Sequence, residues 1–93
     1  MIDHVQANEY LDIYGPLLTA RQQDILSLYY GEDLSYTEIS EELGISRAGV
    51  MDTVHRASAQ LEKYEHVIGY VQKKHKIIQL WQEKKYNEIT NVF

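Results

Sequence analysis

The amino-acid sequence predicts an all-α protein, a bundle of about five helices. Apolar residues recur at intervals of three and four along most of the chain, which is the period of a helix with one buried face. Short polar residues that can cap a helix precede the first four of these segments. The single proline and the first three of the five glycines lie between segments, where helices are expected to end.

Start and stop signals locate the first four helices. The expected capping residues are Asp3, Thr19, Ser35 and Ser46. For three of these caps, a residue three positions later can bond back to the backbone of the cap: Gln6, Gln22 and Glu38. The expected helices lie between Asp3 and Gly15-Pro16, between Thr19 and Gly31, from Ser35 to Leu43, and from Ser46 onward.

The fourth helix has the clearest periodicity. Its apolar residues are spaced four, three and four positions apart: Val50, Val54, Ala57 and Leu61. At about 100° per residue this stripe covers only about 60° of the circumference, so we expect the helix to pack along one seam.

The remainder of the chain, from about Glu65 to the end, contains no proline and is expected to form a long fifth helix. The sequence allows this helix to be interrupted at two places, by a bend near Gly69 or by fraying after Asn87. The apolar residues of this segment are too widely distributed around a helix for one contact surface to cover them: Val67, Ile68, Tyr70, Val71, Ile77, Ile78, Leu80, Trp81, Ile89, Val92 and Phe93.

Residues 34–50 fit a helix-turn-helix position by position. The motif needs a small residue where two helices cross, a turn glycine, an apolar plug, a cap and a core anchor; these are Ser40, Gly44, Ile45, Ser46 and Val50. We therefore expect one domain over residues 1–93, with a helix-turn-helix core at about 19–63 and a helical extension at about 65–93.

This motif and its flanking segments resemble two known classes of protein. Residues 19–61 resemble region 4 of bacterial sigma factors through Thr19, Arg21-Gln22, Tyr36-x-Glu38-Ile39 and His55-Arg56-Ala57. The whole chain is similar to the YlxM-type helix-turn-helix proteins through TARQQDILSLYY (19–30), EDLS (32–35) and the lysine-rich tail. The second resemblance implies an accessory or regulatory protein of the signal recognition particle pathway, associated with the particle's GTPase or its RNA.

Charge is divided unevenly along the chain, whose net charge is −5. Residues 1–70 carry four basic and twelve acidic side chains, a balance of −8, whereas residues 71–93 carry five lysines and two glutamates, a balance of +3. Because the acidic part repels polyphosphate, nucleic acid is expected to bind only at a local basic surface. The alternative is that the lysines form a solvated helix face with no ligand.

The outward face of the second motif helix is poorly suited to DNA. Helical geometry centres this face on Ala48, Asp52, His55 and Ala59, with Met51 and Arg56 at its sides. A carboxylate thus lies where DNA-binding proteins need positive charge. We expect an adaptor that binds the particle's protein or RNA; the alternative is a DNA-binding transcriptional regulator.

The two hypotheses assign the ligand contacts to different residues. The regulator would contact DNA through Arg47, Met51, His55 and Arg56. The adaptor would use tail lysines, together with Tyr70 and Trp81 for stacking or packing: Lys73, Lys74, Lys76, Lys84 and Lys85.

No sequence feature points to an enzyme, a cofactor or a metal site. The chain has no cysteine, its glycines form no phosphate-binding loop, and its histidines lack metal-ligand spacing: His4, His55, His66 and His75. The carboxylates of Glu38, Glu41 and Glu42 are expected on an exposed helix face. The chain has neither a secretory signal nor an apolar stretch of about 18 residues, so we expect a cytoplasmic protein without membrane contact.

The surplus of apolar residues in the tail predicts a homodimer. The first helices cannot cover every face of the tail, and the expected contact residues are Ile77, Ile78, Trp81, Val92 and Phe93. The alternative is a bend in the tail that lets one chain bury them all.

Overall fold

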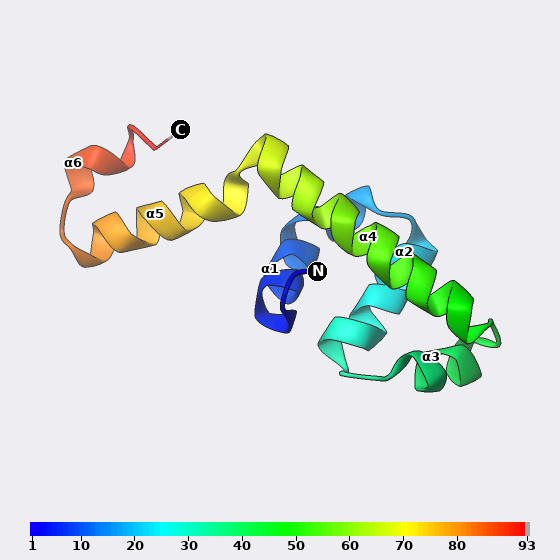
Figure 1. Cartoon of the computed structure of the whole chain (residues 1–93). Helices are drawn as coiled ribbons and strands as arrows, with labels where there is room; N and C mark the ends of the chain where they lie inside the picture. Colours follow the sequence, from blue (N-terminus) through cyan, green and yellow to red (C-terminus); the bar gives the residue numbers. More distant parts are fainter. Residues whose placement is uncertain (93) are drawn as a thin grey trace.

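The computed structural model describes residues 1–92 and confirms the all-α prediction (Figure 1). The helices are α1 (His4–Tyr14), α2 (Ala20–Leu26), α3 (Tyr36–Leu43), α4 (Arg47–Ile68), α5 (Tyr70–Gln82) and α6 (Tyr86–Ile89). A 3-10 turn, η1 (Gly15–Leu17), follows α1, and α2 continues into a π-helical turn, η2 (Ser27–Gly31).

All four predicted caps accept the expected backbone hydrogen bond, but only two of the three predicted return bonds to the cap form, and the one from Gln6 is not among them. Asp3 and Ser46 each accept a hydrogen bond from a backbone N–H three residues later, at 2.8 and 3.0 Å. The pairs Thr19/Gln22 and Ser35/Glu38 both form reciprocal capping boxes. Between α3 and α4, Gly44 adopts a left-handed conformation with φ of 67°, which favours glycine. The helix-turn-helix therefore consists of α3, this turn and the first half of α4.

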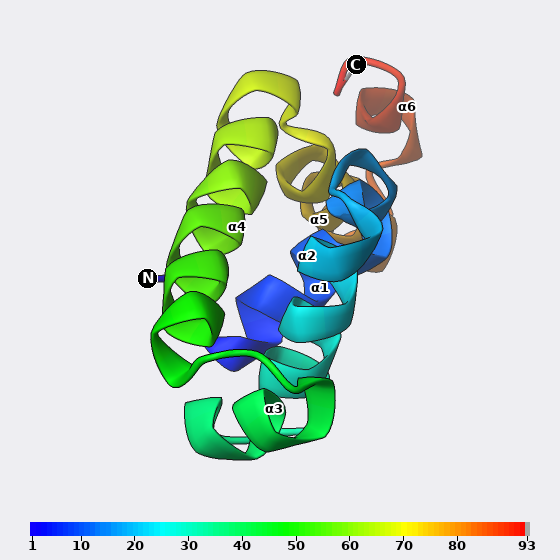
Figure 2. The same ribbon diagram turned by 90° about the vertical axis from the view of Figure 1, so that its right-hand side faces the viewer.

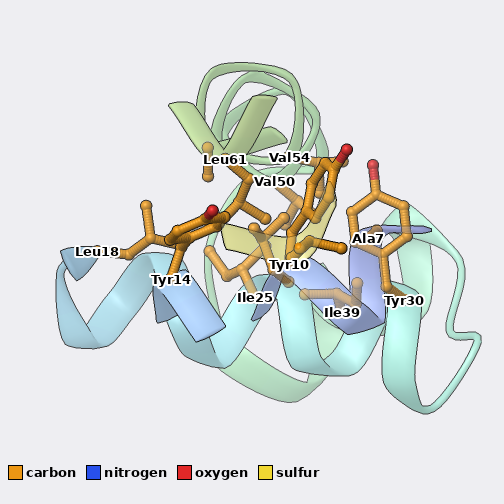
Figure 3. Close-up of a cluster of buried hydrophobic side chains, with 13 residues drawn as sticks. Ala7, Tyr10, Tyr14, Leu18, Ile25, Tyr30, Ile39, Val50, Val54 and Leu61 are labelled. Atoms are coloured by element: carbon orange, nitrogen blue, oxygen red, sulfur yellow. The ribbon is translucent and has the colours of Figure 1, made fainter. Parts of the chain in front are cut away.

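The core lies between α4 and the first three helices (Figures 2 and 3). The predicted stripe of α4 is fully buried, with no exposed area at Val50, Val54, Ala57 or Leu61. These side chains meet Ala7, Tyr10, Tyr14, Leu18, Ile25, Leu26, Tyr30 and Ile39. Ser58 is also buried on α4, and its hydroxyl lies 2.7 Å from that of Tyr30, which satisfies both groups.

The prediction of one long C-terminal helix from about Glu65 is wrong. Helix α4 continues to Ile68, and the expected bend occurs at Gly69, which is left-handed with φ of 68°. A second break follows α5 at Lys84, a non-glycine residue with φ of 58°. The N–H groups of Lys84 and Lys85 donate to the carbonyls of Trp81 and Leu80, so two otherwise unpaired helix-end carbonyls are satisfied.

The chain thus has two regions of different shape. We call residues 1–68 the body and residues 70–92, which contain α5 and α6, the arm. The radius of gyration is 16.1 Å, compared with about 12 Å for a compact chain of this length, because the arm projects beyond the body (Figure 1). Among the described helices, none combines the length and the apolar character that crossing a membrane requires.

Candidate functional site

The exposed face of the recognition helix, at the start of α4, has the composition predicted from the sequence. Ala48, Asp52, His55 and Ala59 are exposed, as are Arg47, Met51 and Arg56 beside them. The helix-turn-helix therefore presents the predicted DNA-contact residues to solvent.

Both arginines of this face already have partners within the chain. The Nε of Arg56 donates to the Asp52 carboxylate at 3.0 Å, an ion pair across one helical turn. The Arg47 guanidinium lies 5.9 Å from the ring centroid of Tyr36 on α3, within cation–π range. The Asp52 charge offsets that of Arg56 where a phosphate would have to approach, so this face offers little net positive charge to DNA.

The predicted lysine contacts lie on the arm, far from this face. Lys73, Lys74 and Lys76 are on α5, and Lys84 and Lys85 follow it. Helix α4 has 22 residues and therefore separates Arg47 from the start of the arm by about 33 Å. Within one chain, the candidate nucleic-acid residues form two separate groups: one lies in the first half of α4, and the other lies on α5, which begins beyond the opposite end of α4 (Figure 1).

The carboxylate of Glu65, in the last turns of α4, connects the arm to the body. This carboxylate accepts hydrogen bonds from the backbone N–H groups of Val71 and Gln72, both at 3.1 Å, and so caps α5 across Gly69. The hydroxyl of Tyr14 on α1 also donates to it and accepts from the N–H of Tyr70. Three helices are thus joined at one carboxylate, which we call the Glu65 junction.

Burial of the Tyr14 ring, and then its bond to the Glu65 carboxylate, raise the pKa of the Tyr14 phenol to about 12. The phenol stays protonated at neutral pH and can keep donating this hydrogen bond. Sequence reasoning missed the junction, because Tyr14 and Glu65 lie 51 positions apart.

A second polar contact joins the arm to the body at Glu9 on α1. The Glu9 carboxylate hydrogen-bonds to His75 and lies 4.0 Å from the Nζ of Lys74. This places Lys74 beside the body, while Lys84 and Lys85 lie beyond the far end of α5.

The predicted oligomer contacts divide into exposed and half-buried residues. Trp81 and Ile78 are 64% and 45% exposed, whereas Ile77 and Val92 are half-buried. The ring of Trp81 packs edge-on against that of Tyr86, with centroids 4.9 Å apart. Phe93 lies outside the described residues.

The arm has only two buried side chains among its described residues, Val71 and Leu80. Val71 joins the core of the body, whereas Leu80 lies on the opposite side of α5, toward α6. Over residues 1–92, moreover, no group of three or more His, Asp or Glu side chains is arranged to hold a metal ion.

Fold and surface together define a helix-turn-helix protein whose recognition helix continues toward a separate lysine-rich arm. The chain belongs to the family described as "Putative helix-turn-helix protein, YlxM / p13 like", which matches residues 1–92.

Relatives cover different shares of the chain. A UPF0122 protein of Desulforamulus reducens is 52% identical over 62 residues, 67% of this chain and 53% of that protein. Another, from Symbiobacterium thermophilum, is 42% identical over 72 residues, which are 77% of this chain and 67% of that protein. A third, from Acetivibrio thermocellus, is 40% identical over 86 residues, which are 88% of this chain and 74% of that protein. The chain thus spans about half the length of the first relative and about three quarters of the third.

Proposed function

We propose that this chain is a cytoplasmic, non-enzymatic accessory protein that binds the protein or the RNA of the signal recognition particle through its arm. The particle is proposed as the partner because of the family resemblance. The arm is proposed as the binding surface because of one observation: it carries five lysines and two glutamates, whereas the body has a charge balance of −8.

The recognition helix is the weaker candidate for binding nucleic acid. Most affinity for a polynucleotide comes from lysine and arginine that neutralise phosphates. Asp52 occupies the middle of the exposed face and is paired with Arg56, so a phosphate that approaches Arg56 would meet a carboxylate beside it. The helix-turn-helix then acts as the rigid support of the arm.

The arm combines lysines with exposed aromatic rings. Tyr70 is 44% exposed and Trp81 is 64% exposed, on the same helix as Lys73, Lys74 and Lys76. Unpaired bases of structured RNA are commonly recognised by stacking on aromatic rings, with basic side chains on the neighbouring phosphates. This combination supports RNA, or an acidic surface of the particle's GTPase, as the ligand.

The test compares two variants that each lose three positive charges, one on the arm and one along α4 of the body. The arm variant carries Lys73→Gln, Lys74→Gln and Lys76→Gln, and the body variant carries Arg47→Gln, Arg56→Gln and Lys63→Gln. Binding of particle RNA is measured by titration at several salt concentrations around about 150 mM. We expect the arm variant to lose binding and its salt dependence, and the body variant to bind within about twofold of wild type. Unchanged RNA affinity in the arm variant would remove the arm from the proposal.

The second candidate is a DNA-binding regulator, favoured by the helix-turn-helix geometry and by the exposure of Arg47, Met51, His55 and Arg56. It predicts sub-micromolar binding to duplex DNA at the same salt, lost in the body variant and kept in the arm variant. A competition assay with duplex DNA, particle RNA and the particle's GTPase separates the two candidates directly. Our proposal predicts that duplex DNA competes least.

A further inference from the structure

The end of the molecule opposite the arm is strongly acidic. Residues 24–42, which we call the acidic end, run from α2 through α3 and contain no lysine or arginine. Their carboxylates are Asp24, Glu32, Asp33, Glu38, Glu41 and Glu42. Asp33 pairs with His4, and Glu38 caps α3, whereas none of the other four takes part in an ion pair within the described chain.

The acidic end contains a hollow of about 330 Å³ between α2, η2 and α3. Its lining includes Leu28 and Leu43, both half-buried, and three exposed carboxylates: Asp24, Glu32 and Glu42. An apolar floor with an acidic rim suits a ligand that offers an apolar or aromatic group flanked by positive charge.

The arm offers a surface of that kind. Four apolar residues of α5 lie within about 100° of its circumference: Tyr70, Ile77, Ile78 and Trp81. Trp81 is the most exposed of them, and Lys84 and Lys85 follow it within four residues. Residues 1–92 of the same chain leave this stripe partly uncovered, and α5 and α3 lie at opposite ends of α4 (Figure 1).

We propose that two copies of the chain pair side by side with antiparallel long axes, so that the arm of each lies on the acidic end of the other. The molecule is 53 Å long and only 21 and 19 Å across, with opposite charge at its two ends. Antiparallel pairing about a two-fold axis brings each basic end beside an acidic one and forms the same contact twice. Trp81 then enters the hollow over Leu28 and Leu43, and Lys84 and Lys85 face its acidic rim.

Charge argues against the simpler dimer in which the two arms pack on each other. That arrangement would bring the five lysines of one arm against the five of its partner, with only two glutamates on each side. Like charges at an interface oppose association, whereas the arm and the acidic end attract each other. The second copy therefore occupies the stripe through its acidic end.

Sedimentation equilibrium at low micromolar concentration tests the pairing on the full chain. Wild type is expected at twice 10.9 kDa in about 50 mM salt, with weaker association in about 500 mM salt. Trp81→Ala is expected to raise the dimer dissociation constant about tenfold or more. The matched control is Val5→Ala, which removes an apolar side chain that is 80% exposed on α1, and it should associate as wild type does. A monomeric wild type would overturn the proposal.

Charge reversal distinguishes this pairing from arm-on-arm contact. Glu32→Lys with Glu42→Lys leaves the arm unaltered, yet it is expected to weaken the dimer about tenfold or more, as is Lys84→Glu with Lys85→Glu. All four substitutions in one chain should restore association, because each reversed arm then meets a reversed acidic end. If the Glu32→Lys, Glu42→Lys variant dimerises like wild type, the arms pair with each other and the proposal is wrong. Circular dichroism verifies the helix content of each variant.

The pairing covers Trp81, so a dimer would bind RNA through Lys73, Lys74 and Lys76 without stacking on that ring. The pairing itself does not depend on the proposed role in the particle. Its test uses Trp81, Lys84 and Lys85 and measures oligomeric state, whereas the RNA test uses Lys73, Lys74 and Lys76 and measures binding. Either can fail while the other holds.

Discussion

The body and the arm are both helical, yet they are held in place by different forces. In the body, α4 buries a continuous stripe against three helices, and Val50, Val54 and Leu61 have no exposed area. In the arm, the two buried residues, Val71 and Leu80, lie on opposite sides of α5. The body can therefore stabilise itself by apolar burial, whereas the arm contributes only Val71 to that core and otherwise depends on the Glu65 junction, on Glu9 and on α6.

The well-packed region of the molecule is therefore not the region whose surface is best suited to bind a ligand. The helix-turn-helix has a well-packed interior, but its outward face carries little net positive charge. The arm has a small interior, but it carries most of the lysines and the largest exposed aromatic side chain. A surface that is weakly covered by its own chain remains available to a partner.

The largest expected effect tests whether body and arm are separate units of stability. Leu61→Ala, in the body, should lower the free energy of unfolding by about 2–5 kcal/mol, because it leaves a cavity at a fully buried site. Leu80→Ala, at the contact of α5 with α6, should shift the main transition by less than about 0.5 kcal/mol. Urea unfolding followed by circular dichroism measures both, at one protein concentration because association would add to stability. Equal losses would mean that arm and body unfold together.

The next effect concerns the Glu65 junction. Glu65→Ala removes the acceptor for the amides of Val71 and Gln72 and the partner of Tyr14. Amide exchange at the start of α5, followed by NMR, should accelerate by a factor corresponding to about 1–3 kcal/mol, while amides of the α4 core change little. Glu62→Ala, one turn earlier on an exposed site of α4, is the matched control and should leave these amides unchanged. Unaltered exchange in Glu65→Ala would show that the junction does not hold the arm.

The smallest effect is a pH dependence at the same junction. The folded-state pKa of Tyr14 is raised to about 12, above the value of about 10 for an unfolded chain. Its contribution to stability is therefore fully present below pH 10 and is lost as the pH rises through about 12. We expect Tyr14→Phe to be about 1–2 kcal/mol less stable than wild type at pH 8, with a smaller difference at pH 11.5. Urea unfolding across this range measures the difference, and a constant gap would contradict the assignment.

Local signals in the sequence were sufficient to predict where the first four helices begin and which side of α4 is buried. Asp3, Thr19, Ser35 and Ser46 are caps whose hydrogen-bond partners lie three residues away, so their role is visible without the fold. The spacing of Val50, Val54, Ala57 and Leu61 likewise defined the buried side of α4, and with it the exposed face that carries Arg47, Met51, His55 and Arg56. Periodicity alone thus located the recognition-helix residues.

The arm was harder to predict because its breaks lack a complete local signal. Gly69 marked a possible bend, but α4 was expected to end before Glu65, because no signal shows that its last turns extend past the core. The end of α5 is unmarked, because Lys84 takes the left-handed conformation usually adopted by glycine, at a cost of about 1–2 kcal/mol. Hydrogen bonds from the N–H groups of Lys84 and Lys85 offset that cost.

By itself, the sequence determined the helical class, the helix-turn-helix, the buried stripe of α4 and the division of charge, because each depends on residues that are close together in the chain. Only the tertiary structure decided where the lysines lie relative to Arg47 and Arg56, and which groups hold the arm. Those outcomes depend on the length of α4 and on contacts such as Tyr14 with Glu65, whose partners are 51 positions apart. Spacing along the chain carries no information about such a pair until the helices between them are packed.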